Sequence, residues 1–376
     1  MENGLFSRNL KMLSPDSFKW FIPLALKFKL HEHHNLNRHY NAIINKYDIE
    51  RKQFLGNKEQ CRYCKAYNKN INSIREKLNR GELEHEKIES FKKIAHSLPT
   101  LIGNVNIISK DECDTCNEKF SKLEENLVSF LGITRTTNKI QSRNGIPKSK
   151  INKHEFVDIS SEGDLIICSY ENSDMIDETD NIITITTKKK YIPTEVHKCF
   201  VKMALAVIPL DKLQYFTKTI HWILGEVELD DNFSKQLYVW QTKWPIRNMF
   251  PYVSIDVYER KFDRIDIPFM FARVCFNNYA FQFPIPCCSM DLLVNNFNMP
   301  AIIKNESPFP ELVANNALWK KILNDTTVKK ISLSNKNKIE EIDRQSYMAM
   351  EKTSSAKIEE LPDEIKKYLE KNKLIK

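Results

Sequence analysis

The chain has 376 residues, of which 41% are hydrophobic and 28% charged, and it carries a formal net charge of +8. This length allows two domains with cores of their own, and no run of 18 apolar residues predicts a membrane span. Nine cysteines, an odd number that includes two Cys-x-x-Cys pairs, favour a reducing compartment over a disulfide framework. We therefore expect a cytoplasmic protein.

Residues 1–50 are predicted to form an N-terminal helical segment. Residues 18–30 are apolar but are interrupted by Pro23 and lysines, and we interpret them as a core helix or a strand with a turn. Apolar residues then recur at helical spacing from Tyr40 to Tyr47. Four histidines between residues 31 and 39 could bind metal, but a polar loop before the helix is the simpler interpretation.

Two Cys-x-x-Cys pairs predict a metal site. Four thiolates from two such pairs form the tetrahedral set that zinc prefers, with bonds of roughly 2.3 Å. A closed site of this kind is structural, because it leaves no open coordination position. Core thiols at this spacing by chance are the alternative, and the other five cysteines are expected to be small buried side chains. The predicted zinc ligands are Cys61, Cys64, Cys113 and Cys116.

Between the two pairs, residues 71–89 look like a helical hairpin that turns at Arg80 and Gly81. Residues 92–96 then form a short predicted strand that ends in Ala95 and His96. From Cys116 apolar residues recur at helical spacing as far as Gly132, and this helix places Asn117 and Glu124 on one face.

The chain contains three segments in order, CRYC at 61–64, KKIAHSLPTLIGN at 92–104 and DECDTCNEKFSKLEENLVSFLG at 111–132. Taken in this order, the three segments resemble the zinc-stapled branch of the HNH endonucleases, the ββα-metal nucleases. The resemblance covers residues 61–132 and implies that His96 is the general base that activates a water. It also implies that Asn117 binds a catalytic Mg²⁺ or Mn²⁺ ion. The middle motif residue, which fixes the catalytic loop, is Asn104 or Asn106.

The sequence departs from the family at two positions. Many relatives have Asp before the catalytic histidine, where this chain has Ala95, and others have His in place of Asn117. Because Mg²⁺ favours carboxylate oxygens, Glu124 is the candidate for the missing carboxylate. The alternative is that Glu124 is a solvated helix residue paired with a lysine.

The positive charge is confined to one part of the chain. Residues 51–155 contain 21 Lys and Arg against 13 Asp and Glu, whereas the remainder has 36 of each. A polyanion is expected to bind there, because neutralised phosphates supply most non-specific affinity. A run of cations at 134–153 without acids is either a phosphate contact or a solvated surface; it includes Arg135, Lys139, Arg143, Lys148 and Lys150.

Residues 156–330 are predicted to form an α+β domain with an antiparallel sheet. Strands are expected at 164–169 and 182–186, and two helices broken at Pro209 at 195–225. Apolar and polar residues alternate from residue 252, which predicts a strand. A hairpin with its turn at Asn277 and Asn278 is expected after it. Residues 331–376 read as a charged, mobile tail.

The fold class is therefore α+β: an HNH nuclease domain at 51–155 with a four-cysteine zinc site, followed by the α+β domain. The resemblance implies a metal-dependent DNA endonuclease of bacterial anti-phage defence, with RNA not excluded as substrate. Duplex cleavage would require a homodimer or successive events, and an activating protein or small ligand at the C-terminal domain remains open. The alternative is a non-catalytic zinc module that binds nucleic acid or protein.

Overall fold

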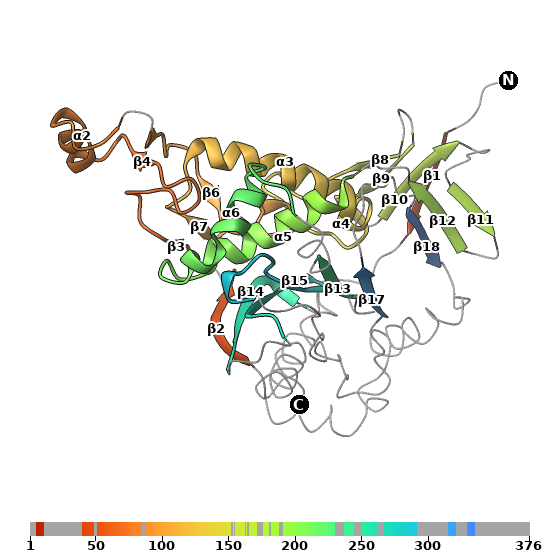
Figure 1. Ribbon diagram of the computed structural model, residues 1–376. Helices are drawn as coiled ribbons and strands as arrows, with labels where there is room; N and C mark the ends of the chain where they lie inside the picture. The colour runs from red at the N-terminus through yellow and green to blue at the C-terminus, as the bar shows by residue number, and fades with distance from the viewer. Residues whose placement is uncertain are drawn as a thin grey trace, which may run out of the picture.

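The computed structural model describes residues 5–10, 40–48, 51–84, 87–151, 153, 155–161, 163, 165–170, 176–179, 182–187, 191–229, 237–243, 250–261, 267–291, 315–320 and 329–334. It has mixed α and β structure with several antiparallel sheets (Figure 1). No helix in this part of the chain combines the length and the apolar character that a membrane crossing requires.

A six-stranded antiparallel sheet is the largest element of the structure, with strand order β17-β13-β16-β15-β14-β2. Its strands are β2 (Tyr40–Tyr47), β13 (Tyr238–Lys243), β14 (Phe250–Arg260), β15 (Met270–Asn277), β16 (Tyr279–Pro284) and β17 (Asn315–Lys320). Every residue of β15 and β16 is buried, which explains the dense run of aromatic and aliphatic residues there.

The turn between β15 and β16 falls where the sequence predicted it. Phe276 pairs with Tyr279, so Asn277 and Asn278 form the two-residue connection. Asn277 has φ +52°, a conformation that asparagine tolerates better than most residues. Its Nδ2 donates to the backbone oxygen of Asn138 at 2.8 Å, so the turn is fixed to the segment after α4.

Helices α3 (Asp114–Leu131), α5 (Pro193–Val207) and α6 (Thr217–Ile223) lie together on one side of this sheet (Figure 1). Helix α5 is apolar around nearly its whole circumference and is almost entirely buried, as expected for a helix enclosed by other elements. Phe200 of α5 packs against Phe281 and Phe283 of β16, with ring centroids 4.8 and 5.5 Å apart. Figure 1 places α3 alongside α5.

The cysteine pairs flank a small three-stranded sheet of order β3-β7-β6, made of β3 (Gln53–Leu55), β6 (Ala95–His96) and β7 (Ile107–Ser109). Strand β7 pairs antiparallel with β6 and parallel with β3. A two-stranded sheet of β4 (Tyr67–Asn68) and β5 (Ile88–Glu89) accompanies it, with α2 (Asn72–Asn79) between these strands in the chain.

Two further sheets complete the described structure. One has the order β1-β10-β9-β8, formed by β1 (Leu5–Leu10), β8 (Ser149–Lys150), β9 (Phe156–Ile159) and β10 (Leu165–Tyr170). The other has the order β11-β12-β18, formed by β11 (Ile176–Thr179), β12 (Ile182–Thr187) and β18 (Lys329–Ser334). The one-turn helix α4 (Thr134–Thr137) lies between α3 and β8 in the chain.

Several sequence predictions are confirmed and two are wrong. Strands β10 and β12, helix α5 and the β15–β16 hairpin lie where they were predicted. Residues 40–47 form strand β2 and not a helix, because β14 offers a partner edge far away in the sequence. Residues 71–89 hold the single helix α2 and then β5, not a helical hairpin. The run at 18–30 and the histidines at 31–39 lie outside the described residues.

One apolar cluster contains residues from both predicted domains. Leu123 and Phe130 of α3 belong to the same buried cluster as Phe200 of α5 and Phe281 of β16. The predicted boundary between residues 155 and 156 therefore crosses a shared core.

Candidate metal centre and catalytic loop

The four predicted cysteines come together at the start of α3. Their Sγ atoms all lie within 4.8 Å of one another, and those of Cys64 and Cys113 are 3.6 Å apart. A zinc tetrahedron with bonds of roughly 2.3 Å separates its sulfurs by about 3.8 Å. The cluster could therefore hold a metal ion and fits a zinc site. Among the described residues no other group of three or more His, Cys, Asp or Glu side chains has such an arrangement.

Local backbone structure positions the ligands. The turn after Cys64 closes with a bond of 3.0 Å from Lys65 N to the oxygen of Cys61, and Lys65 takes φ +62°. Cys113 is the N-cap of α3, and its sulfur accepts from the backbone N of Cys116. Hydrogen bonds from Cys113 and then Cys116 lower the pKa of Cys61 to about 7, and the pKa of Cys64 is lowered as well, whereas those of Cys113 and Cys116 are raised.

His96 lies on β6, where Ala95 pairs with Ser109 and His96 with Ile108. Its side chain is half-buried. Burial lowers the pKa of His96 below its ordinary value, and the positive charges of Lys202 and Arg143 lower it further, while Asp48 opposes them. At pH 7 the imidazole is therefore neutral and able to accept a proton, as a general base must be.

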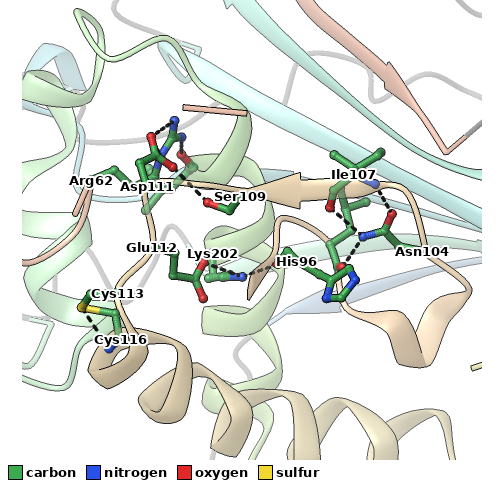
Figure 2. A network of polar contacts seen from close by, with 12 residues as sticks. Arg62, His96, Asn104, Ile107, Ser109, Asp111, Glu112, Cys113, Cys116 and Lys202 are labelled. Carbon is green, nitrogen blue, oxygen red and sulfur yellow. Dashed lines mark hydrogen bonds and ion pairs between the residues drawn. The ribbon is translucent and has the colours of Figure 1, made fainter. Parts of the chain in front are cut away.

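Asn104 holds the loop between β6 and β7 closed. It is fully buried, and its Nδ2 donates to the backbone oxygens of Leu98 at 2.5 Å and Ile107 at 3.1 Å. Its Oδ1 accepts from Ile107 N at 3.0 Å (Figure 2). Of the two asparagines considered for this role, Asn104 makes the contacts that fix a loop. The backbone N of Asn106 instead donates to Asp48 Oδ1 at 2.9 Å.

Two charged side chains hold the outside of the same loop. Asp48 accepts from the backbone N of Val105 at 2.7 Å as well as from Asn106. Arg135 donates from Nε to the backbone oxygen of Leu101 at 3.1 Å and is only 8% exposed. Arg135 was predicted to contact nucleic acid; in the structure its side chain is buried and bonded to this loop.

A buried ion pair links the cysteine cluster to the strand of His96. Lys202 of α5 lies 3.1 Å from Glu112 Oε2, and its Nζ donates to the backbone oxygen of His96 at 2.8 Å (Figure 2). The side chains of Lys202 and Glu112 are 2% and 0% exposed. Burial raises the pKa of Glu112, and the nearby Lys202 opposes that rise. Since Glu112 directly precedes Cys113, the pair fixes β6 relative to the metal cluster.

A second buried ion pair lies beside the first cysteine pair. Arg62 Nη2 is 2.9 Å from Asp111 Oδ2, and its Nη1 donates to the backbone oxygen of Leu205 at 2.6 Å. Leu205 lies in the last turn of α5, and its oxygen would normally accept from residue 209, which is a proline without an N–H. Arg62 therefore caps α5. Gly56 is required here, because a Cβ on it would lie 2.0 Å from Asp111 Oδ2.

Glu124 lies on the same face of α3 as Asn117, about two turns further along the helix, and both side chains are half-buried. Burial raises the pKa of Glu124, the charge of Lys202 opposes that rise, and the charge of Glu112 adds to it. Lys202 thus acts on the pKa of both His96 and Glu124, and Asn117 lies near the start of the helix that carries Glu124.

The other predicted phosphate contacts differ in their surroundings. Arg143 and Lys150 are exposed, and Arg143 lies close enough to lower the pKa of His96. Lys148 is exposed but lies 3.5 Å from Asp158 Oδ2 and over the ring of Phe156. Lys139 is half-buried and takes φ +54°. Of this set, Arg143 is the residue whose charge acts on the pKa of the candidate catalytic histidine.

Sequence reasoning missed Lys202, Glu112 and Asp48. One signal was present for Lys202: a lysine within the otherwise apolar stretch CFVKMALAV predicts a buried anionic partner, because a lone buried ammonium is costly. No comparable signal existed for Asp48, whose partners lie 57 and 58 residues away.

Comparison of the chain with protein-family models, with curated proteins and with solved structures gave no match. The site is therefore interpreted from its own residues.

Proposed function

We propose that this protein is a metal-dependent endonuclease of the HNH type that hydrolyses DNA phosphodiester bonds. The observation that carries the proposal is a neutral, half-buried His96 on a short hairpin, directly followed by a helix that starts at a four-cysteine cluster. The order of hairpin, cysteine cluster and helix matches what the sequence resemblance implies. The +8 charge of residues 51–155 and the position of Arg143 support a polyanionic substrate.

In the proposed reaction a ring nitrogen of His96 takes a proton from water. The hydroxide oxygen forms a bond to phosphorus as the bond from phosphorus to the 3′-oxygen breaks, and the 3′-oxygen takes a proton from solvent water, which leaves 5′-phosphate and 3′-hydroxyl ends. Asn104 keeps the loop after β6 closed, and Lys202 holds the backbone of His96, so the imidazole is positioned before substrate binds. Arg143 attracts the phosphodiester to this point.

A divalent ion such as Mg²⁺ or Mn²⁺ would supply charge neutralisation at the scissile phosphate. Glu124 and Asn117 are the residues of α3 that would hold it. One carboxylate and one amide fit such an ion only when substrate phosphate and water complete its shell, as is usual for Mg²⁺. Zinc at the four cysteines would be structural in this proposal.

A specific observation favours the non-catalytic alternative. Glu124 already has the ammonium of Lys202 in its surroundings, so its charge is partly balanced without a metal ion. In that case Glu124 belongs to the buried ion-pair group, and the module binds nucleic acid through its basic surface without cleaving it.

Plasmid cleavage with purified, zinc-loaded protein tests the proposal. We expect nicking in Mg²⁺ or Mn²⁺, its loss in His96→Ala, and a large loss in Glu124→Gln. His221→Ala is the matched control, because His221 is an exposed histidine on α6 that pairs with Glu226. Zinc content and circular dichroism must be unchanged in each variant. Binding of DNA without cleavage of DNA or RNA by the unaltered protein would contradict the nuclease and favour the alternative.

A further inference from the structure

An aromatic side chain lies in the same row of the small sheet as His96. In the register of β3, β7 and β6, Phe54 is the partner of Ile108, and Ile108 is the partner of His96. Residues that are direct partners across strands project from the same face of a sheet. Two strand spacings of about 4.8 Å separate the backbones of Phe54 and His96 by roughly 10 Å.

This face is open at Phe54, whereas the opposite face is covered. Phe54 is 53% exposed, although a phenylalanine is usually buried. The next row, which points the other way, consists of Leu55 packed against the core and of buried Ser109 and Ala95. The row of Leu55 is therefore buried, whereas the row of Phe54 is exposed at Phe54, buried at Ile108 and half-buried at His96.

Two residues that adjoin the strands of this sheet, one apolar and one basic, are relevant to Phe54. Ile94, two residues before His96, is 68% exposed. The Nζ of Lys110 lies 4.3 Å from the centroid of the Phe54 ring. A flat aromatic with a cation over one face matches a nucleotide, whose base can stack on the other face of the ring and whose phosphate offers negative charge. A protein or lipid partner would explain the apolar groups but not the excess of positive charge in residues 51–155.

We propose that Phe54 is a base-stacking residue that directs this site to single-stranded or locally unpaired nucleic acid. Within a paired duplex both faces of a base are covered by its neighbours, and Phe54 cannot stack on it. This inference rests on the proposed function and names its substrate class.

The test measures binding in the full-length, zinc-loaded His96→Ala background, where nothing is cut. The probes are a single-stranded oligonucleotide with a central 2-aminopurine and the same sequence as a duplex. Stacking quenches 2-aminopurine fluorescence, and we expect this quenching with the single strand. Phe54→Ala should abolish it and weaken single-strand binding roughly 5- to 150-fold while duplex binding stays within about twofold. Phe54→Trp should preserve both signals.

Tyr252→Ala is the control, because Tyr252 is another exposed aromatic, 44% accessible, and lies on β14 outside this row. Equal weakening of both probes, an unchanged affinity for the single strand, or no binding of either probe would overturn the inference. These results are separate from the fate of the proposed function. If the unaltered protein cleaves DNA but Phe54→Ala does not change binding, the proposed nuclease function stands and the stacking role of Phe54 is refuted. If binding depends on Phe54 but no cleavage is found, the stacking role stands and the nuclease function is refuted.

Discussion

Replacing Lys202 by Met should strongly destabilise the protein. The substitution keeps a long flexible side chain but removes the ammonium from Glu112, whose side chain is 0% exposed. Removal of one member of a buried ion pair costs about 3–5 kcal/mol, because the remaining charge is left uncompensated. The backbone oxygen of His96 also loses its donor at 2.8 Å. In the variant the pKa of Glu112 rises further, so the folded state binds a proton that the unfolded state releases, and the loss is larger at pH 8 than at pH 5.

Urea unfolding of the zinc-loaded protein measures this loss in a double-mutant cycle of Lys202→Met, Glu112→Gln and the double variant. We expect the double variant to be more stable than the sum of the single losses predicts. Lys198→Met is the matched control on the same helix, because its pair with Glu195 is partly exposed and should contribute at most about 1 kcal/mol. A loss below about 1 kcal/mol for Lys202→Met, or strict additivity, would refute the reasoning.

Three further variants have expected outcomes. Cys113→Ser should lose zinc, and with it the near-ultraviolet circular dichroism signal of the folded site. A full zinc content in this variant would contradict a four-cysteine site. Arg143→Gln should raise the pKa of His96, because it removes a positive charge, so the acid limb of the pH profile of cleavage should move to higher pH. An acid limb that does not move would mean that Arg143 does not act on His96. Arg143→Gln should also reduce the slope of log K against log salt by about 1. Arg135→Gln should leave that slope unchanged but lower the urea midpoint, because Arg135 holds a loop; a changed slope would show that it contacts phosphate.

Local patterns in the sequence were sufficient for the elements whose signals are local. The Cys-x-x-Cys pairs, the helix after Cys116 and the hairpin at Asn277 each depend on residues close together in the chain. Strand β2 was mistaken for a helix because Ile43 and Ile44 suit either period, and its pairing with β14, far away in the sequence, decided the outcome.

The polar contacts around the site depend on long-range packing and could not be predicted in this way. Lys202 and the His96 carbonyl that it binds are 106 residues apart, and Arg62 and Leu205 are 143 apart. Spacing along the chain carries no information on which lysine reaches which carbonyl. The same limit explains why Arg135 was predicted to contact nucleic acid: its partner Leu101 precedes it by 34 residues.

Helix α5 shares a core with the segment that carries the cysteines, although the sequence placed it in a separate domain. Arg62 follows Cys61 and caps the end of α5, while Glu112 precedes Cys113 and pairs with Lys202 inside α5. A fragment of residues 51–155 would keep Arg62 and Glu112 beside the cysteines but lose the helix that both of them bind, leaving the apolar face of α3 exposed. We therefore expect this fragment to bind zinc without forming a stable fold. Hydrogen exchange tests this: strong protection of β6 and β7 in the isolated fragment, equal to that in the full chain, would contradict a shared core.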